Sequence, residues 1–169
     1  MKLLTITHKL ILMLILGLDP GSVRVGYGLI EKNKNELTLL KSGLLKIKSR
    51  DKHQRLLELE KDFSKLIKKT KPELVILEKL FFMKNLKTAL EVAQSRGVLT
   101  LLTVKYKIPL LEFSPSEIKI AVTGYGRADK KAVAKMVAQI LKVPKIKEID
   151  DVTDAIAAAI TGAHYINFK

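Results

Sequence analysis

The sequence contains no cysteine, and this absence excludes several classes of site. Disulfide bonds, zinc sites built from thiolates and cysteine nucleophiles all need that residue. Because a chain without disulfides is typical of the cytoplasm, we expect a cytoplasmic protein. The 169 residues, of which 47% are hydrophobic, are enough for one domain with one well-buried core.

Long apolar runs are scarce as well. Residues 11–16 form an apolar run behind a short segment with two lysines, which superficially resembles a secretion signal. The run is too short to span a bilayer, lacks a cleavage site of small residues and leads directly into a predicted core strand. We therefore expect no membrane association. We assign residues 1–12 to an N-terminal extension, with Met13 as an alternative start, and residues 13–169 to a single domain.

Acidic residues are in the minority. The chain has 17 Asp and Glu against 31 Lys and Arg, which gives a formal net charge of +14 at pH 7. A surplus of this size attracts polyanions and raises the rate of encounter with them. A solvated, lysine-rich surface is the alternative explanation, but the charge favours nucleic acid as the partner.

The order of the predicted elements indicates the fold class. Three strands joined as hairpins come first, over residues 12–18, 25–31 and 37–47. They are followed by a helix over residues 51–69, a strand over 74–77, a helix over 84–104 that is interrupted at Gly97, and a strand over 110–113. Three further helices begin at residues 115, 129 and 151. This order predicts an α/β fold with a mixed five-stranded sheet. Three antiparallel strands come first, parallel strands follow, and helices cover both faces.

Four of the carboxylates lie at the ends of these elements. Asp19 and Glu78 each end an apolar run typical of a buried strand, and Asp151 and Asp154 stand three residues apart at the start of the last helix. Such positions can converge at one edge of an α/β sheet. Each residue alone has an ordinary explanation, as a turn residue, an ion-pair partner or a helix cap. Together they indicate a site for hard divalent cations, which prefer oxygen ligands.

A site of this kind changes what is expected of the histidines. A pair of divalent ions stabilises both the attacking and the leaving oxygen of a phosphodiester displacement, so that no general-base side chain is required. We therefore predict that His8, His53 and His164 are surface or packing residues without a catalytic role.

Six motifs that extend over most of the chain resemble one family. They are Gly17-Leu-Asp-Pro-Gly-Ser-x-x-x-Gly-Tyr-Gly28, Glu78-x-x-Phe81, Lys84-Asn85, Gln94-Ser-Arg-Gly97, Gly124-x-Gly126 and Asp151-x-x-Asp154-Ala-Ile-Ala157. In this order they resemble the RuvC-type Holliday-junction resolvases of bacteria, which have a ribonuclease H-like fold. The match begins at about Met13 and continues to the end of the chain.

The resemblance implies roles for particular residues. The catalytic acids would be Asp19, Glu78, Asp151 and Asp154, which would bind two Mg²⁺ ions, with Mn²⁺ as a possible substitute; some members carry histidine at the position of Asp151. Two lysines would approach the DNA backbone near the cut, and an aromatic side chain would stack on an unpaired base at the junction centre. These residues are Lys119 and Lys130, with Lys131 beside the second, and Phe81. From the residues alone the lysines would be ordinary surface residues, and core packing explains Phe81 equally well.

The implied activity is the Mg²⁺-dependent resolution of four-way DNA junctions during recombination and repair. Paired symmetric nicks in opposing strands would leave 5′-phosphate and 3′-hydroxyl ends. The resemblance also implies a homodimer that cooperates with a branch-migration helicase. For the dimer interface, the helix over residues 84–104 with Leu86, Leu90 and Leu101 is the candidate, and a wholly internal core helix is the alternative.

Two other functions fit parts of the sequence. The Gly-Leu-Asp-x-Gly-Ser turn also resembles the phosphate loop of actin-like ATPases and sugar kinases, but those proteins need two such domains and 169 residues accommodate one. A non-catalytic DNA-binding module is the second alternative. It would gain nothing from four acids, because negative charge in a DNA groove weakens binding unless metals neutralise it.

Overall fold

A single mixed sheet forms the centre of the molecule. The computed structural model describes residues 12–79, 86–144, 146 and 150–166. In these ranges five strands lie in the order β3-β2-β1-β4-β5. The first three, β1 (Leu12–Pro20), β2 (Arg24–Asn33) and β3 (Glu36–Lys46), pair antiparallel, whereas β4 (Leu74–Glu78) runs parallel to β1 and β5 (Leu110–Phe113) runs parallel to β4. The predicted sheet is therefore confirmed.

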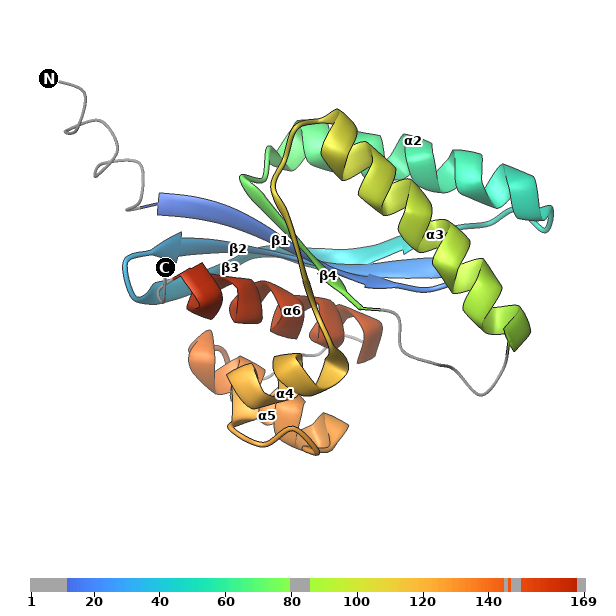
Figure 1. Cartoon of the computed structure of the whole chain (residues 1–169). Coiled ribbons are helices and arrows are strands. Elements are labelled where there is room, and N and C mark those ends of the chain that lie inside the picture. The colour runs from blue at the N-terminus through green and yellow to red at the C-terminus, as the bar shows by residue number, and fades with distance from the viewer. Residues whose placement is uncertain (1–11, 80–85, 145, 147–149, 167–169) are drawn as a thin grey trace, which may run out of the picture.

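Helices cover both faces of this sheet (Figure 1). One face carries α2 (Lys52–Thr70) and α3 (Leu86–Lys105), and the other carries α6 (Asp150–Ile166) with α4 (Pro115–Thr123) and α5 (Lys130–Ile140) beside it. Within the described ranges no helix is long and apolar enough to serve as a membrane span.

Local signals in the sequence set the helix ends. The carboxylate of Asp51 accepts a hydrogen bond from the backbone N–H of Gln54 and starts α2, which ends at Lys71 in a left-handed conformation (φ 47°). A reciprocal capping box between Ser114 and Glu117 starts α4, and the helix begins at residue 115 as predicted.

The predicted interruption of α3 is wrong. The helix runs unbroken from Leu86 to Lys105 and passes through Gly97. A glycine inside a helix costs about 1 kcal/mol relative to alanine. The burial of Leu99 and Leu102, which α3 contributes to the core beneath it, offsets this cost. The predicted beginning of the helix at Lys84 lies outside the described residues.

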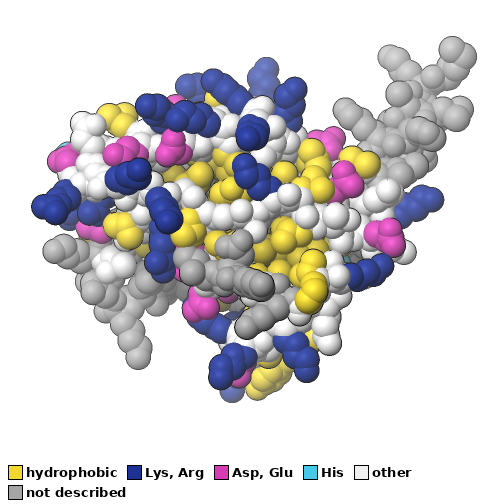
Figure 2. All heavy atoms as spheres, turned by 180° about the vertical axis from the view of Figure 1, so that it is seen from behind, with side chains coloured by type: hydrophobic (Ala, Val, Ile, Leu, Met, Phe, Trp, Pro, Cys, Tyr) yellow, Lys and Arg dark blue, Asp and Glu magenta, His cyan; other side chains and the backbone are white. Residues whose placement is uncertain are grey.

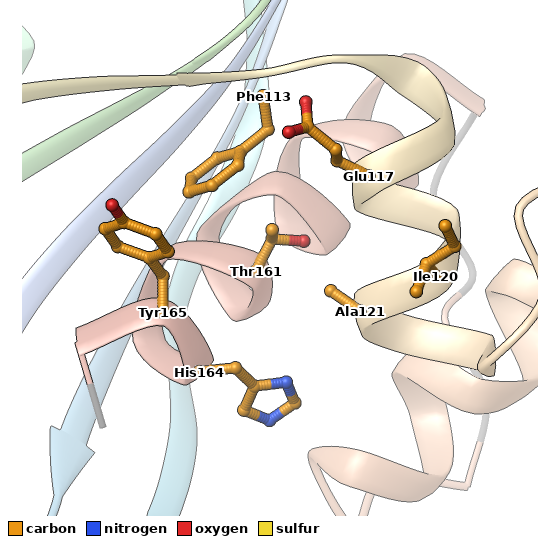
Figure 3. A pocket seen from close by; sticks show the side chains of 7 residues that line it. All are labelled: Phe113, Glu117, Ile120, Ala121, Thr161, His164 and Tyr165. Atoms are coloured by element: carbon orange, nitrogen blue, oxygen red, sulfur yellow. The ribbon is translucent and has the colours of Figure 1, made fainter. Parts of the chain in front are cut away.

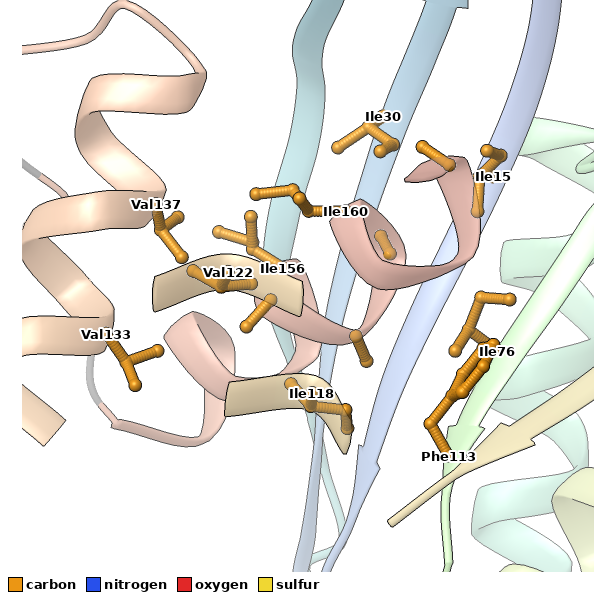
Figure 4. Packing of buried hydrophobic residues seen from close by; sticks show 14 of the residues in the cluster. Ile15, Ile30, Ile76, Phe113, Ile118, Val122, Val133, Val137, Ile156 and Ile160 are labelled. Atoms are coloured by element: carbon orange, nitrogen blue, oxygen red, sulfur yellow. The ribbon is translucent and has the colours of Figure 1, made fainter. Parts of the chain in front are cut away.

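The core has two halves, one on each face of the sheet. Successive side chains of a strand point to opposite faces, so Ile15 of β1 packs under α6 while Leu16 and Leu18 pack under α2 and α3. Figure 4 shows the half under α6, where Ile15 and Ile76 from the sheet lie close to the helix. Because β1 is buried on both faces, its apolar run is continuous rather than alternating.

The close approach of α6 to the sheet depends on two glycines. A Cβ atom placed on Gly17 would lie 2.0 Å from the carbonyl oxygen of Ala155, and one on Gly26 would lie 2.1 Å from that of Asp151. Neither position can hold a larger residue without moving the helix. The first turn of α6 therefore rests directly on β1 and β2, and this contact fixes where its acidic residues lie.

Candidate metal centre at the carboxyl edge of the sheet

Asp19 and Glu78 lie side by side at one edge of the sheet. In the parallel pairing of β1 and β4, Leu18 is opposite Leu77, so the next residue of each strand, Asp19 and Glu78, leaves the sheet at the same place. Asp19 shares the face of Gly17, because residues two apart in a strand point the same way. That face is the one on which α6 packs.

The first turn of α6 brings two more carboxylates to this edge. The contact between Gly26 and the backbone of Asp151 places the helix start over β2, which neighbours β1. Asp151 and Asp154 are three residues apart and therefore neighbours on the helix surface. The four acids thus lie at one edge of the sheet, and their role as metal ligands stays a prediction.

The pKa values reflect how close these acids are to one another. Burial, followed by the negative charges of Glu78, Asp154 and Asp151, raises the pKa of Asp19 to about 7. The pKa of Glu78 is raised mainly by burial and then by Asp154, and that of Asp154 is also raised mainly by burial. Raised pKa values on neighbouring carboxyls mean that their ionised forms lack sufficient compensating positive charge.

This donor set fits a divalent cation. Its four carboxylates supply hard oxygen ligands. A cation between them would offset the free-energy cost of burying neighbouring negative charges, which is what raises the pKa values. As the side chains stand, however, the described residues contain no group of three or more acids arranged to hold one ion. Two acids are turned toward cationic side chains instead: Asp151 pairs with Arg24, and Asp154 lies 4.0 Å from Lys130 Nζ. Binding of a metal therefore requires these side chains to rearrange.

Two of the predicted DNA-contacting lysines lie beside the acids. A small pocket of about 110 Å³ is lined by Glu78 and Asp154 together with Lys119 and Lys130. Lys130 Nζ donates a hydrogen bond to Asp150 Oδ2 at 3.0 Å, and this bond is the main reason that the pKa of Lys130 is raised. A phosphate group at the carboxylates would thus meet two ammonium groups.

The two remaining predicted contacts do not lie in this pocket. Lys131 lines a separate hollow of about 500 Å³ along α5, with Lys135 and apolar residues up to Ile146. Adjacent helix residues point about 100° apart, so Lys130 and Lys131 cannot both face the carboxylates. Phe81 lies outside the described residues, and its stacking role stays a prediction.

Comparison with known proteins identifies the family. A model of the family described as "Crossover junction endodeoxyribonuclease RuvC" matches residues 15–162. The chain belongs to the RuvC family. The protein of that name from Prochlorococcus marinus (strain NATL2A) is 42% identical over 153 residues, 90% of this chain and 99% of the relative. The RuvC protein from Thermosipho melanesiensis is 41% identical over 148 residues, which cover 87% of this chain and 94% of the relative.

Solved structures of the RuvC family agree with this assignment. Thermus thermophilus RuvC superposes with a TM-score of 0.83 at 26% identity, covering 92% of this chain and 96% of that one. The same protein in complex with a Holliday junction substrate gives a TM-score of 0.86. The ribonuclease H-like fold and the family resemblance of the sequence are confirmed. The comparisons support neither the ATP-binding alternative nor the non-catalytic one.

Two arginines at the RuvC-type site were missed by reasoning from the sequence. Arg96 of α3, only 15% exposed, donates hydrogen bonds to the backbone carbonyl of Glu78 and to the carboxylate of Glu112. It therefore ties α3 to the ends of β4 and β5 and positions Glu78. Arg24 at the start of β2 donates to both oxygens of Asp151. One signal could have indicated each of them: Arg96 lies in a family motif, and Arg24 is two residues from Gly26, on the face that α6 covers.

A larger pocket lies away from the carboxylates. It measures about 490 Å³ and is lined by residues of β5, α4 and the last turns of α6, as Figure 3 shows: Phe113, Glu117, Ile120, Ala121, Thr161, His164 and Tyr165. About ten residues of α6 separate Asp154 from His164, which corresponds to roughly 15 Å along the helix. The pocket lined by His164 is thus not the site of the predicted chemistry. His164 lines its wall, consistent with a packing role.

Proposed function

We propose that this chain is a metal-dependent endonuclease that resolves Holliday junctions by paired symmetric nicks in opposing strands, during recombination and DNA repair. One observation carries the proposal: in a member of the RuvC family, Glu78 and Asp154 share a pocket with Lys119 and Lys130. Carboxylates without positive charge nearby would repel a phosphodiester. Carboxylates that hold metal ions, with ammonium groups beside them, attract one.

The metal ligands in this proposal are Asp19, Glu78, Asp151 and Asp154, with two Mg²⁺ ions per site and Mn²⁺ as a substitute. The raised pKa of Asp19, near 7, supports a set of acids that a divalent cation would stabilise. When bound, such ions supply Lewis-acid stabilisation of the charge on the phosphate and its leaving oxygen.

The side chains of the protein would orient the DNA. Lys119 and Lys130, which line the pocket from the α4 and α5 side, would contact oxygens of the scissile phosphate. Arg96 holds the backbone at Glu78 and so fixes the direction of that carboxylate. Hydrolysis joins a water oxygen to phosphorus while the bond to O3′ breaks, which leaves a 5′-phosphate and a 3′-hydroxyl. Arginines and lysines elsewhere, which are spread over the face shown in Figure 2 rather than gathered in one patch there, would add general attraction for DNA.

A homodimer through α3 is part of the proposal, because two matched nicks need two sites and the described residues contain one such set of acids. Leu90, Leu101 and Val104 are 68%, 65% and 63% exposed. With Gly97 they form a stripe along one side of α3, opposite the side that packs on the sheet. Apart from its chain neighbours and the backbone of α3 itself, a Cβ atom placed on Gly97 would have no described atom within 4 Å. A stripe of this kind supports close packing against the same helix of a second copy. The side chain of Leu86, also predicted to lie here, is outside the described part.

The open space at Gly97 provides a sharp test of the interface. Gly97→Gln leaves the monomer without a clash and should not lower its stability, because glycine is the poorer helix former, but the added side chain should block a partner helix. Sedimentation should show a dimer for the unaltered chain at micromolar concentration, or on junction DNA, and a monomer for the variant. Leu57→Gln, which alters an equally exposed leucine of α2, is the control and should leave the dimer intact. A dimer that survives Gly97→Gln would refute this interface.

Three further parts of the proposal depend on family membership. We place the protein in the cytoplasm, expect it to act with a branch-migration helicase, and assign residues 13–169 to the nuclease domain, with residues 1–12 as an extension. A chain that begins at Met13 should then melt at the same temperature as the full chain and cleave at the same rate.

The activity itself is tested with purified protein, a synthetic four-way junction and Mg²⁺, with linear duplex of the same sequence as the control. The junction should be cut and the duplex left intact, and chelator should abolish cutting. Asp154→Asn should bind the junction as well as the unaltered protein, or more tightly, without cutting it. Equal cutting of junction and duplex would contradict the proposed specificity.

A further inference from the structure

The carboxylate of Asp151 is occupied by a side chain of the protein itself. Arg24 Nε donates to Asp151 Oδ2, and Arg24 Nη2 lies 3.4 Å from Oδ1. The guanidinium is 53% exposed, whereas the carboxylate is 23% exposed. Arg24 therefore closes the site from the solvent side, where DNA would arrive.

This ion pair and metal binding compete with each other. Arg24 donates to both oxygens of Asp151 and so occupies lone pairs that a cation would use, and the two positive charges repel at such close range. The arrangement of the described acids, in which no three can hold an ion together, agrees with a ligand set that Arg24 keeps incomplete. Asp151 must leave Arg24 before it can join Asp19, Glu78 and Asp154.

A DNA phosphate is a suitable competitor for Arg24. The planar fork of a guanidinium matches two phosphate oxygens as well as it matches a carboxylate. Because exposed ion pairs contribute little free energy, exchange of one anionic partner for another changes the equilibrium by a factor of roughly five or less. Arg24 can thus transfer from Asp151 to the backbone of bound DNA at little cost in free energy.

We propose that Arg24 is a positioning residue that holds Asp151 away from the metal centre in the DNA-free protein and releases it when a DNA phosphate takes the guanidinium. This inference rests on the proposed nuclease function. It couples the two ligands of the enzyme: DNA completes the metal site, and the free protein binds metal weakly. By reciprocity, metal also strengthens the binding of DNA.

The test measures Mn²⁺ binding to the full chain without DNA, by electron paramagnetic resonance. Arg24→Gln should bind Mn²⁺ roughly twofold to fivefold more tightly than the unaltered protein, the range expected for loss of one exposed ion pair worth up to about 1 kcal/mol. Arg24→Lys, which keeps the charge but not the two-point contact, should be intermediate. Lys46→Gln is the matched control, because Lys46 lies directly opposite Arg24 on β3 and forms no ion pair with another described residue. It should change Mn²⁺ affinity by less than twofold.

An unchanged or weaker affinity for Mn²⁺ in Arg24→Gln would overturn the proposal, as would an equal gain in Lys46→Gln, which would indicate a general effect of charge. The proposed contact between Arg24 and a DNA phosphate is tested by measuring how junction binding depends on salt in the presence of chelator. Loss of one phosphate contact should lower the slope of log K against log salt by about 1 in Arg24→Gln, and an unchanged slope would overturn this contact. If the unaltered protein neither binds Mn²⁺ nor cuts junctions, the nuclease function fails. If it does both and Arg24→Gln binds Mn²⁺ no more tightly, the role of Arg24 alone fails.

Discussion

Neutralising Asp19 should stabilise the metal-free protein. In the folded chain the pKa of Asp19 is raised from 3.8 to about 7, by burial first and then by the other three acids. The difference is about 3 pKa units, and each unit corresponds to ~1.4 kcal/mol, so that ionised Asp19 costs the fold up to about 4 kcal/mol. Asp19→Asn removes the charge but still buries a polar group. We therefore expect a gain of about 2 kcal/mol in the free energy of unfolding.

The gain should depend on pH in a defined direction. A carboxyl whose pKa is higher in the folded state favours folding while it is protonated. Its contribution is fully present below the unfolded pKa of about 4 and is lost as the pH rises through 7. The advantage of Asp19→Asn over the unaltered protein should therefore be largest at pH 8 and should shrink steadily toward pH 5.

The assay is thermal unfolding in chelator, followed by circular dichroism at pH 5, 6, 7 and 8. For a domain of this size ~2 kcal/mol corresponds to roughly 4–8 °C in melting temperature. Asp62→Asn is the control, because Asp62 of α2 pairs with the exposed Lys65 at 3.3 Å and is remote from the acids; it should not stabilise the protein at any pH. Saturating Mg²⁺ should shrink or reverse the difference, since metal stabilises the unaltered protein more. Equal melting temperatures at pH 8 in chelator, or a lower one for Asp19→Asn, would refute the reasoning.

Variants of four further residues test the role proposed for each of them. Glu78→Gln should abolish cleavage and preserve junction binding, and near-normal turnover at saturating Mg²⁺ would remove Glu78 from the ligand set. Lys119→Ala should lower the cleavage rate by roughly 10²-fold and binding far less, whereas Lys68→Ala on α2 should change mainly the salt dependence; equal losses of cleavage would end the special role of Lys119. Arg96→Ala should lower the free energy of unfolding by about 1–3 kcal/mol, because the half-buried carbonyl of Glu78 and the carboxylate of Glu112 lose their donor, and should slow cleavage. Arg96→Lys should recover part of both losses, and unchanged stability and rate would contradict its positioning role. Phe81→Ala should impair cleavage of intact junctions more than of nicked ones, since a nick already relieves the cost of unstacking, and equal losses would remove the stacking role.

The sheet and the convergence of the acids could be predicted because short-range patterns specify them. The apolar runs that end at Asp19 and Glu78 mark two parallel neighbours, and parallel neighbours present their carboxyl ends at one edge. The capping box at Ser114 depends on residues only three apart. Patterns of this kind are local, and the sequence displays them directly.

The partners of the acids could not be predicted in the same way. Arg24 and Asp151 are 127 residues apart, and their contact depends on how far α6 extends over β2. The continuity of α3 through Gly97 is likewise decided by tertiary packing rather than by helix propensity. The separation of Lys131 from Lys130 could have been predicted from the sequence, because adjacent residues of a helix point about 100° apart.

The most direct test of junction resolution is to map the incisions on a four-way junction whose four strands are labelled one at a time. Two active sites related by a twofold axis predict cuts at symmetric positions in two opposing strands, and products that ligase can seal. Random nicks, cuts in adjacent strands, or a single unpaired nick made by a strictly monomeric protein would contradict the proposed function.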